Sequence, residues 1–287
     1  MSSRIVLIHN DEIERLNYIR PLLKRMSNDF NLKFHQISQQ SLKHINLINA
    51  IEKRIVLELG NSRMRKYWNI DKMEFFSIII DLIKFFYSIF FRSSFRKLHI
   101  HRLKIEDALT LKHIEAINGF AQSCKDDDVL FVFESDAYIK DIEYFKLVIS
   151  QIILDVTVID LFMLAFPFTF SELNLKISEK YSNSRNNLLS INYPKFIFNT
   201  TVCYAVSGNL AKKISGYTIL EKKNKSLTPA DFYLNDILFK ISDALKHKNK
   251  EITRIYDPSP VLNGSFTELY ESTVNPKILN ENKINTN

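Results

Sequence analysis

The sequence predicts an α/β fold: a single domain with a mostly parallel central sheet flanked by helices. Apolar runs of strand length alternate with segments of helical periodicity along most of the chain. The composition, 46% hydrophobic and 25% charged with 5 Gly and 7 Pro, supplies a core and excludes a linker-rich protein. We expect one domain over residues 1–274 and a polar C-terminal tail over 275–287.

The first half of the chain is predicted to alternate strands and helices. We expect strands over 4–10 and 31–38, with a helix between them over 11–26. Apolar residues at three-residue steps predict another helix over 105–124. Segment 54–60 fits a helix and a strand equally well.

The second half continues this alternation as far as residue 245. The expected elements are a strand over 129–133, a helix over 142–153, a strand over 156–166, a polar loop region over 171–190, a strand over 199–208, a short helix over 209–220, a helix over 228–245 and a late loop over 255–266. The helix over 228–245 has Thr228 as its cap and Pro229 in its first turn.

Segment 73–92 is the most apolar of the chain and is predicted to be helical. Its polar residues trace one helical stripe: Glu74, Ser77, Asp81, Lys84 and Ser88. Three charges inside it, Glu74, Asp81 and Lys84, in addition to Arg92 at its end, exclude a membrane span. Two interpretations remain open, a core helix or a helix lying in a membrane interface. The basic segment that follows, up to residue 104, leads us to treat 73–104 as an insertion made of an amphipathic helix and a basic segment.

The net charge of +7 is concentrated in the first third of the chain. Residues 1–104 hold 19 Lys and Arg against 9 Asp and Glu. Such a surplus indicates an anionic partner, either nucleic acid, an anionic membrane surface or phosphorylated small molecules, unless it is only a solvated basic face. No nucleic-acid motif occurs, and the aromatics lie in an apolar stripe rather than between basic residues, so no nucleic acid is expected.

Cys124 and Cys203 lack metal-knuckle or disulfide-framework spacing, which fits a reducing compartment. The N-terminal apolar run is too short for a signal-peptide core. We therefore expect a cytoplasmic protein, with peripheral contact at the inner membrane face under the interface interpretation.

The predicted strand over 129–133 leads directly into Glu134, Ser135 and Asp136. No Gly-x-Gly-x-x-Gly or Gly-x-x-x-x-Gly-Lys stretch occurs. Ligands of parallel sheets bind beyond the carboxyl ends of strands, and alternation in an extended chain would place both acids on one side. A divalent cation between them would relieve their repulsion and hold a diphosphate. The alternative is a strand cap followed by an ordinary turn.

Six stretches carry a resemblance to a known family, in the family's order. They are VLIHNDEIERLNYIRPLL, the pair Glu106 and His113, the DxD-like FVFESDA, CYAVSGNLAKKI, TPADFYLND and DPSPVLNGSF. With these the chain resembles glycosyltransferase family 25, lipooligosaccharide galactosyltransferase-like enzymes of GT-A-type fold, over nearly its whole length. It departs from the family pattern at Ser135, which replaces an acid, at Ala108-Leu109, which replaces Gly-Cys, and at Lys112, which replaces Ser.

The resemblance implies a metal-dependent, inverting transfer of a galactose-like hexose from a nucleotide-sugar, a UDP-hexose. The acceptor would be a lipid-linked oligosaccharide or another cell-surface glycan, and the cofactor Mn²⁺ or Mg²⁺. Glu134 and Asp136 would bind the metal and Asp231 would be the catalytic base. The implied donor-binding residues are Asn10, Arg15, His113, Glu134, Ser207 and Asn263.

Each of these assignments has a purely structural alternative. Asp231 is also an ordinary first-turn Asp favoured by the helix dipole. Asn10 and Arg15 also fit a helix entrance, and His113 also fits a buried hydrogen-bonding role. The alternative for the whole chain is a catalytically inactive protein of the same fold that binds a glycan or a protein partner, with Ser135 marking the loss of activity.

Overall fold

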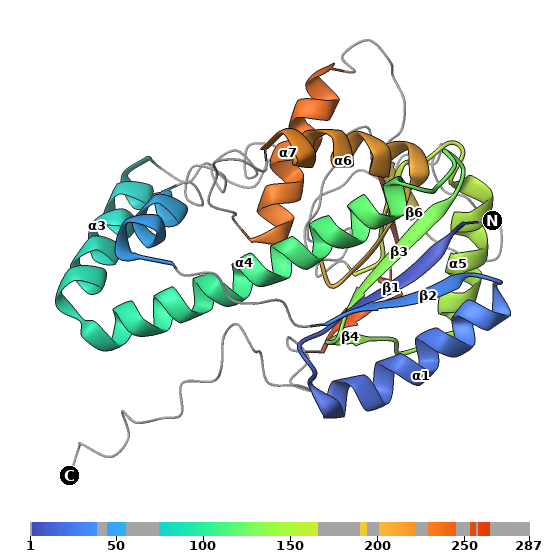
Figure 1. Cartoon of the computed structure of the whole chain (residues 1–287), viewed down its shortest axis with the longest axis horizontal. Helices are drawn as coiled ribbons and strands as arrows, with labels where there is room; N and C mark the ends of the chain where they lie inside the picture. Colours follow the sequence, from blue (N-terminus) through green and yellow to red (C-terminus); the bar gives the residue numbers. More distant parts are fainter. Residues whose placement is uncertain are drawn as a thin grey trace.

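The fold is that of a computed structural model, which describes residues 2–38, 45–55, 75–165, 190–193, 201–221, 229–244, 253–256 and 258–264 (Figure 1). The tail expected over 275–287 and nearly all of the loop region expected over 171–190 lie outside these residues. Thr228, the expected helix cap, also lies outside them.

The described strands form a seven-stranded sheet, and the predicted α/β class is confirmed. The strands are β1 (Arg4–Ile8), β2 (Lys33–Ile37), β3 (Val129–Glu134), β5 (Leu161–Met163), β6 (Ser190–Tyr193), β7 (Cys203–Ser207) and β8 (Thr253–Tyr256). Their order across the sheet is β2-β1-β3-β7-β5-β8-β6. The pairings give β1, β2, β3, β5 and β8 one direction and β7 and β6 the other, so the sheet is mostly parallel.

Apolar residues alternate between two cores, one on each face of the sheet. In β1, Ile5 and Leu7 enter one core, whereas Val6 and Ile8 enter the other. This alternation is why the strand reads as one continuous apolar run, because both of its faces are buried. The sheet is therefore the middle layer of three.

Helices form the outer two layers (Figure 1). One face is covered by α1 (Ile13–Asp29) and α5 (Ile142–Asp155), which supply residues such as Leu16 and Phe145. The other is covered by α4 (Ser93–Ala121), α6 (Gly208–Glu221) and α7 (Ala230–Ala244), which supply residues such as Phe120, Leu210 and Leu234.

Helix α4 reaches beyond the sheet to a separate small helical group. It has 29 residues, about 44 Å at about 1.5 Å per residue. Its later turns pack on the sheet, while its first turns pack with α3 (Phe75–Phe91) and a helical segment over 47–55 (Figure 1). A third core lies there, built around Phe85, Ile89 and Leu103.

The sequence prediction placed the boundaries of this region incorrectly. The helix expected over 105–124 begins at Ser93, so the basic segment forms its first turns and residue 104 is not a boundary. Residues 54 and 55 are helical, and the rest of the ambiguous segment 54–60 lies outside the described residues. The helix predicted over 73–92 is confirmed as α3.

The sequence prediction missed several short strands and made another one too long. Segment 156–166 contains only the three residues of β5, preceded by a turn. Strand β6 begins where a loop was expected, and the late loop contains the end of β8 and also β9 (Leu262–Asn263), which pairs with β4 (Ala137–Tyr138). Two to four residues are too few for a periodic pattern, and their partners are distant in sequence.

Cys124 and Cys203 are buried and unbridged. None of the helices in the described part of the chain has the length and apolar character needed to cross a bilayer.

Candidate functional site

The candidate site lies at the carboxyl edge of strands β1 and β3. The two strands are parallel neighbours, and Ile8 lies opposite Glu134 in their register. The segment that follows β1, His9 and Asn10, therefore starts beside the end of β3, where Ser135 follows Glu134. This edge is where ligands of parallel sheets bind.

The acidic segment does not continue as an extended strand, which corrects the expectation from sequence. Ser135 and Asp136 form a turn between β3 and β4, so strand alternation does not relate Glu134 to Asp136. Ser135 is buried, and its hydroxyl donates to Glu12 Oε2 at 3.2 Å. The carbonyl of Asp136 accepts from the Gly264 N–H at 2.8 Å. Because β4 and β9 pair with Ala137 opposite Asn263, Asn263 is brought next to the acidic segment.

His113, on α4, connects this acidic segment to strand β7. Its ring is completely buried, with Nε2 at 3.2 Å from Glu134 Oε1 and Nδ1 at 3.0 Å from the Tyr204 hydroxyl. Burial, and then the charge of Glu134, raise the pKa of Tyr204 well above its usual value, so its hydroxyl stays protonated and can donate to Nδ1. With Nδ1 accepting from Tyr204, Nε2 is the ring nitrogen that donates to Glu134.

Lys112, the neighbour of His113, is a buried cation at the end of β1. Its ammonium group donates to the carbonyl of His9 at 2.6 Å and also to Asn10 Oδ1. Burial lowers the pKa of Lys112, and the charges of Glu12, Asp11 and Glu134 partly counteract this effect. The ammonium group thus holds Asn10 in place and adds positive charge beside Glu134.

Glu12 and Arg15 complete the β1 side of the site. The Asn10 N–H donates to Glu12 Oε2 at 2.8 Å, and Arg15 Nη1 lies 4.0 Å from Glu12 Oε1. Although burial opposes ionisation, hydrogen bonds from the backbone N–H groups of Asn10 and Glu12 and the charge of Arg15 lower the pKa of Glu12. Glu12 is therefore an ionised carboxylate that positions Asn10, Arg15 and Ser135.

Asp231, in the first turn of α7, has the most distinctive electrostatic environment of the site. Burial raises its pKa to about 7, and the negative charges of Glu134 and Glu106 also raise it. Its Oδ1 accepts from the Phe232 N–H at 2.9 Å, which partly offsets these effects. A carboxyl group that titrates near neutral pH can accept and release protons under physiological conditions.

Ser207 is the one predicted site residue that the structure places elsewhere. Strand β7 is antiparallel to β3, and Ser207 lies opposite Val129, at the other end of β3 from Glu134. That end is about 17 Å away, at about 3.3 Å per residue. The Ser207 hydroxyl is fully buried, donates to Asp160 Oδ1 at 2.6 Å and accepts from the Leu210 N–H at 3.0 Å. It therefore caps the start of α6 rather than binding a donor.

The arrangement is compatible with a divalent cation held mainly by a substrate. The described part of the chain has no group of three or more His, Cys, Asp or Glu side chains placed to hold a metal ion. Mg²⁺ in particular is commonly bound through only one or two carboxylates together with substrate phosphates. The acidic segment contains two carboxylates, Glu134 and Asp136, which is the number that such binding requires.

Four residues of the site were not recognised as functional from the sequence: Glu12, Glu106, Lys112 and Tyr204. Tyr204 lies in an otherwise ordinary buried strand, and only the antiparallel register, which pairs it with Val132, places it near His113. Lys112 had a weak signal, since a Lys within the apolar repeat of an amphipathic helix requires an internal partner. For Glu12 no such local signal exists, and Glu106 was noted only for its seven-residue separation from His113.

A scan against models of known protein families gives no match to this chain, and a search of curated proteins gives none either.

Proposed function

We propose that this protein is a metal-dependent glycosyltransferase that moves a galactose-like hexose from a nucleotide-sugar to a cell-surface glycan or lipooligosaccharide acceptor. The observation that carries the proposal is Asp231. Its carboxyl group has a pKa of about 7, which burial raises first and the negative charges of Glu134 and Glu106 raise further. A general base is most effective when its pKa lies near the working pH, and Asp231 meets this condition.

In the proposed reaction Asp231 takes the proton of the attacking acceptor hydroxyl. The acceptor oxygen forms a bond to the anomeric carbon of the donor as the bond from that carbon to the diphosphate oxygen breaks. The diphosphate leaves with the electron pair, and the configuration at the anomeric carbon inverts. Asn10 and Arg15 lie beyond β1, where a nucleoside could bind, and Lys112 provides positive charge nearby.

The diphosphate carries more negative charge than Lys112 and Arg15 can neutralise, so it needs a further counterion. Glu134 and Asp136 would hold Mn²⁺ or Mg²⁺, which neutralises charge that develops on the leaving group. The hydrogen bond from His113 to Glu134 fixes the orientation of one of these carboxylates.

The proposal is tested by adding UDP-hexoses to the protein with and without Mn²⁺, and by repeating this with Asp136→Ala. We expect donor binding and slow donor hydrolysis that depend on the metal and fall at least tenfold in the variant, because one metal ligand is lost. Asp127→Ala, an exposed residue at the opposite end of β3, is the matched control and should retain both. Donor binding is measured by calorimetric titration. If no UDP-hexose gives heat, or if the heat is the same with and without metal, the metal proposal is contradicted and the inactive binding protein is favoured.

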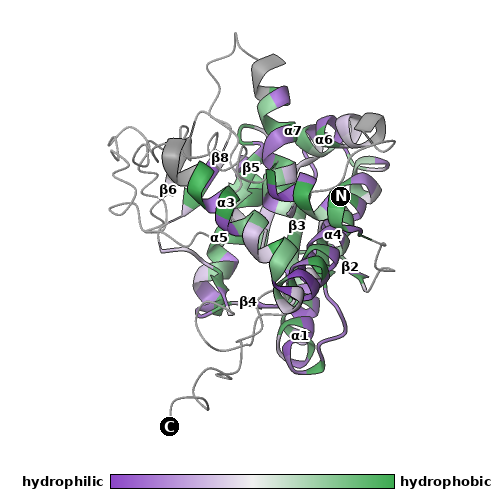
Figure 2. Cartoon of the chain, turned by 90° about the vertical axis from the view of Figure 1, so that its left-hand side faces the viewer, coloured by the Kyte–Doolittle hydropathy of each residue, from purple (hydrophilic) through white to green (hydrophobic). Residues whose placement is uncertain are grey.

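We also propose that α3 binds an anionic membrane surface next to the acceptor lipid. One side of α3 is in the core, with Ile89 at 0% exposure, whereas Phe90 and Phe91 are 50% and 77% exposed. Figure 2 views the molecule from the α3 end and shows the hydrophobic residues of this helix. The cations Arg92, Arg96 and Lys97 follow, which is the composition of an interfacial helix.

The membrane proposal predicts that the protein sediments with vesicles containing anionic lipid. The double variant Phe90→Glu/Phe91→Glu should lose most of this binding, because apolar contact becomes charge repulsion. The matched control is Leu147→Glu/Leu154→Glu, which alters two exposed apolar residues of α5. Equal losses in the two double variants, or equal binding to uncharged vesicles, would argue against α3 as the contact.

A further inference from the structure

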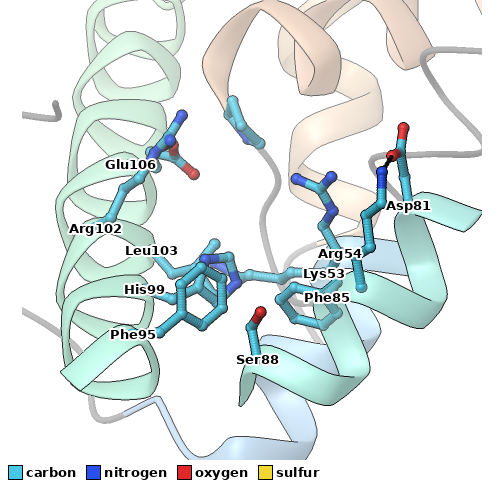
Figure 3. Close-up of a pocket in the computed structure, with 12 residues that line it drawn as sticks. Lys53, Arg54, Asp81, Phe85, Ser88, Phe95, His99, Arg102, Leu103 and Glu106 are labelled. Carbon is cyan, nitrogen blue, oxygen red and sulfur yellow. Dashed lines mark hydrogen bonds and ion pairs between the residues drawn. The ribbon is translucent and has the colours of Figure 1, made fainter. Parts of the chain in front are cut away.

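A cavity lies outside the sheet, among α3, the first turns of α4 and the helical segment over 47–55 (Figure 3). Its volume is about 440 Å³, which is within the range of small-molecule binding sites. The polar stripe predicted for α3 contributes Asp81, Lys84 and Ser88 to its lining. These three residues of the stripe border the cavity, and the side chain of Lys84 is also largely exposed to solvent.

Cationic side chains predominate in the lining of this cavity. They are Lys53, Arg54, Lys84 and Arg102, against the carboxylates Asp81 and Glu106. Figure 3 shows Arg102 and Glu106 on one side of the cavity and Arg54 and Asp81 on the other. Lys53 pairs with Asp107 at 2.5 Å and Arg102 with Glu106 at 2.8 Å. The contact between Lys84 and Asp81 is loose at 3.9 Å. A surplus of positive charge in a partly enclosed space favours an anionic ligand.

Three rings form an apolar wall next to these cations. The ring centroid of His99 lies 5.1 Å from that of Phe85 and 5.8 Å from that of Phe95. Burial, and then the charges of Arg54 and Arg102, lower the pKa of His99 to about 4, so its ring is neutral near pH 7. Its buried Nε2 has no hydrogen-bond partner within the described ranges, so a ligand can satisfy it.

We propose that this cavity binds a phosphorylated sugar, with the phosphate among Arg54, Lys84 and Arg102 and the sugar ring against Phe85 and Phe95. Guanidinium groups match the geometry of phosphate oxygens, and the aromatic faces match the apolar face of a sugar ring. The phosphate can belong to a soluble sugar phosphate or to a lipid headgroup, because both present the same group.

The position of the cavity identifies this ligand as the acceptor, an identification that rests on the proposed function. Glu106 lines the cavity, and its charge is one of those that raise the pKa of Asp231. Pro229, two residues before Asp231, lines it as well. A sugar extending from the phosphate site would therefore approach the carboxyl group of Asp231.

The test is calorimetric titration of the full chain with three probes: inorganic pyrophosphate, hexose 1-phosphate and a short-chain phosphatidic acid. We expect at least one phosphate probe to bind, and Lys84→Gln/Arg102→Gln to weaken that binding at least tenfold. The matched control, Lys24→Gln/Arg25→Gln, removes two exposed positive charges from α1, outside the cavity lining, and should change binding less than twofold. Ser88→Trp, which fills the cavity without changing charge, should also weaken binding at least tenfold.

The outcomes separate this inference from the proposed function. Absence of binding by all three probes overturns the inference, as does an equal loss in the cavity and control double variants. Binding of hexose 1-phosphate alone identifies a soluble source, and binding of phosphatidic acid alone identifies a lipid. If phosphate binding follows this pattern while no UDP-hexose binds with Mn²⁺, the cavity stands as a phosphate site and the glycosyltransferase proposal fails.

Discussion

Asp231→Asn is expected to lower the turnover of sugar transfer by about 10²- to 10⁴-fold, the usual contribution of a general base. The amide keeps the size of the side chain and its hydrogen bond with the Phe232 N–H but cannot accept a proton. The affinity for the nucleotide-sugar should change little, because the donor is held on the β1 and β3 side of the site. Single-turnover kinetics with donor and acceptor would separate these two effects.

Asp231→Asn should also change how turnover and folding stability depend on pH, with opposite effects on the two quantities. Turnover by the unmodified protein should rise as pH increases through about 7, since Asp231 acts as a base only when ionised. The native state binds the proton of Asp231 more tightly than the unfolded state, so the stability that this residue contributes falls as pH rises from about 4, its pKa in the unfolded chain, to about 7. Asp231→Asn should therefore be less active but more resistant to unfolding at pH 8.

Asp236→Asn is the control for both measurements. Asp236 lies on the same helix and pairs with Lys240 at 2.9 Å on the surface, a contact that contributes about 1 kcal/mol at most. Full activity in Asp231→Asn, or the same pH response of stability in both variants, would show that Asp231 is only a first-turn residue of α7.

Gly208→Ala is expected to destabilise the fold by about 3 kcal/mol, the upper end of typical overpacking costs. Gly208 begins α6 directly after β7, and its N–H donates to the Asp128 carbonyl at 2.7 Å. A Cβ atom there would lie 1.8 Å from the carbonyl oxygen of Lys125 and 3.1 Å from Cys124 Sγ. The nearest atom belongs to the backbone, so the turn at residues 125–128 or the start of α6 would have to move.

Gly216→Ala tests the same substitution without the obstruction. Gly216 is in the same helix, and no atom of the described residues lies within 4 Å of the position that a Cβ atom would take there. We expect this variant to be stabilised by about 0.5–1 kcal/mol, because alanine loses less backbone entropy in a helix than glycine does. Denaturant unfolding of both variants measures the difference; similar stabilities would mean that the Lys125 turn gives way at little cost.

The elements with local signals were predictable from the sequence. Strands β1 and β3 are buried on both faces and appear as continuous apolar runs, and α3 has a clear polar stripe. The direction of β7 carries no local signal, because antiparallel pairing with β3 depends on contacts between segments about 75 residues apart. Ser207, which only the resemblance selected, consequently lies at the opposite end of β3 from Glu134.

The candidate site, like the fold, was predictable from the sequence only where a local signal exists. The rule that ligands bind beyond strand ends selected Asn10 and Glu134, and the register places Ile8, two residues before Asn10, opposite Glu134. The phosphate cavity was not predictable, because its lining comes from three helices and its cations are scattered over some 50 residues of sequence. A basic first third indicated an anionic partner but not where that partner would bind.

The position of β8 has a consequence for the order in which the protein can assemble. This strand separates β5 from β6 and is the only partner of β6 among the described strands, yet it is synthesised at residues 253–256 of 287. While the ribosome is still translating, a nascent chain can join β2, β1 and β3 but must leave the edge of β5 open. Premature termination before residue 253 should therefore yield aggregation-prone products rather than a smaller folded protein.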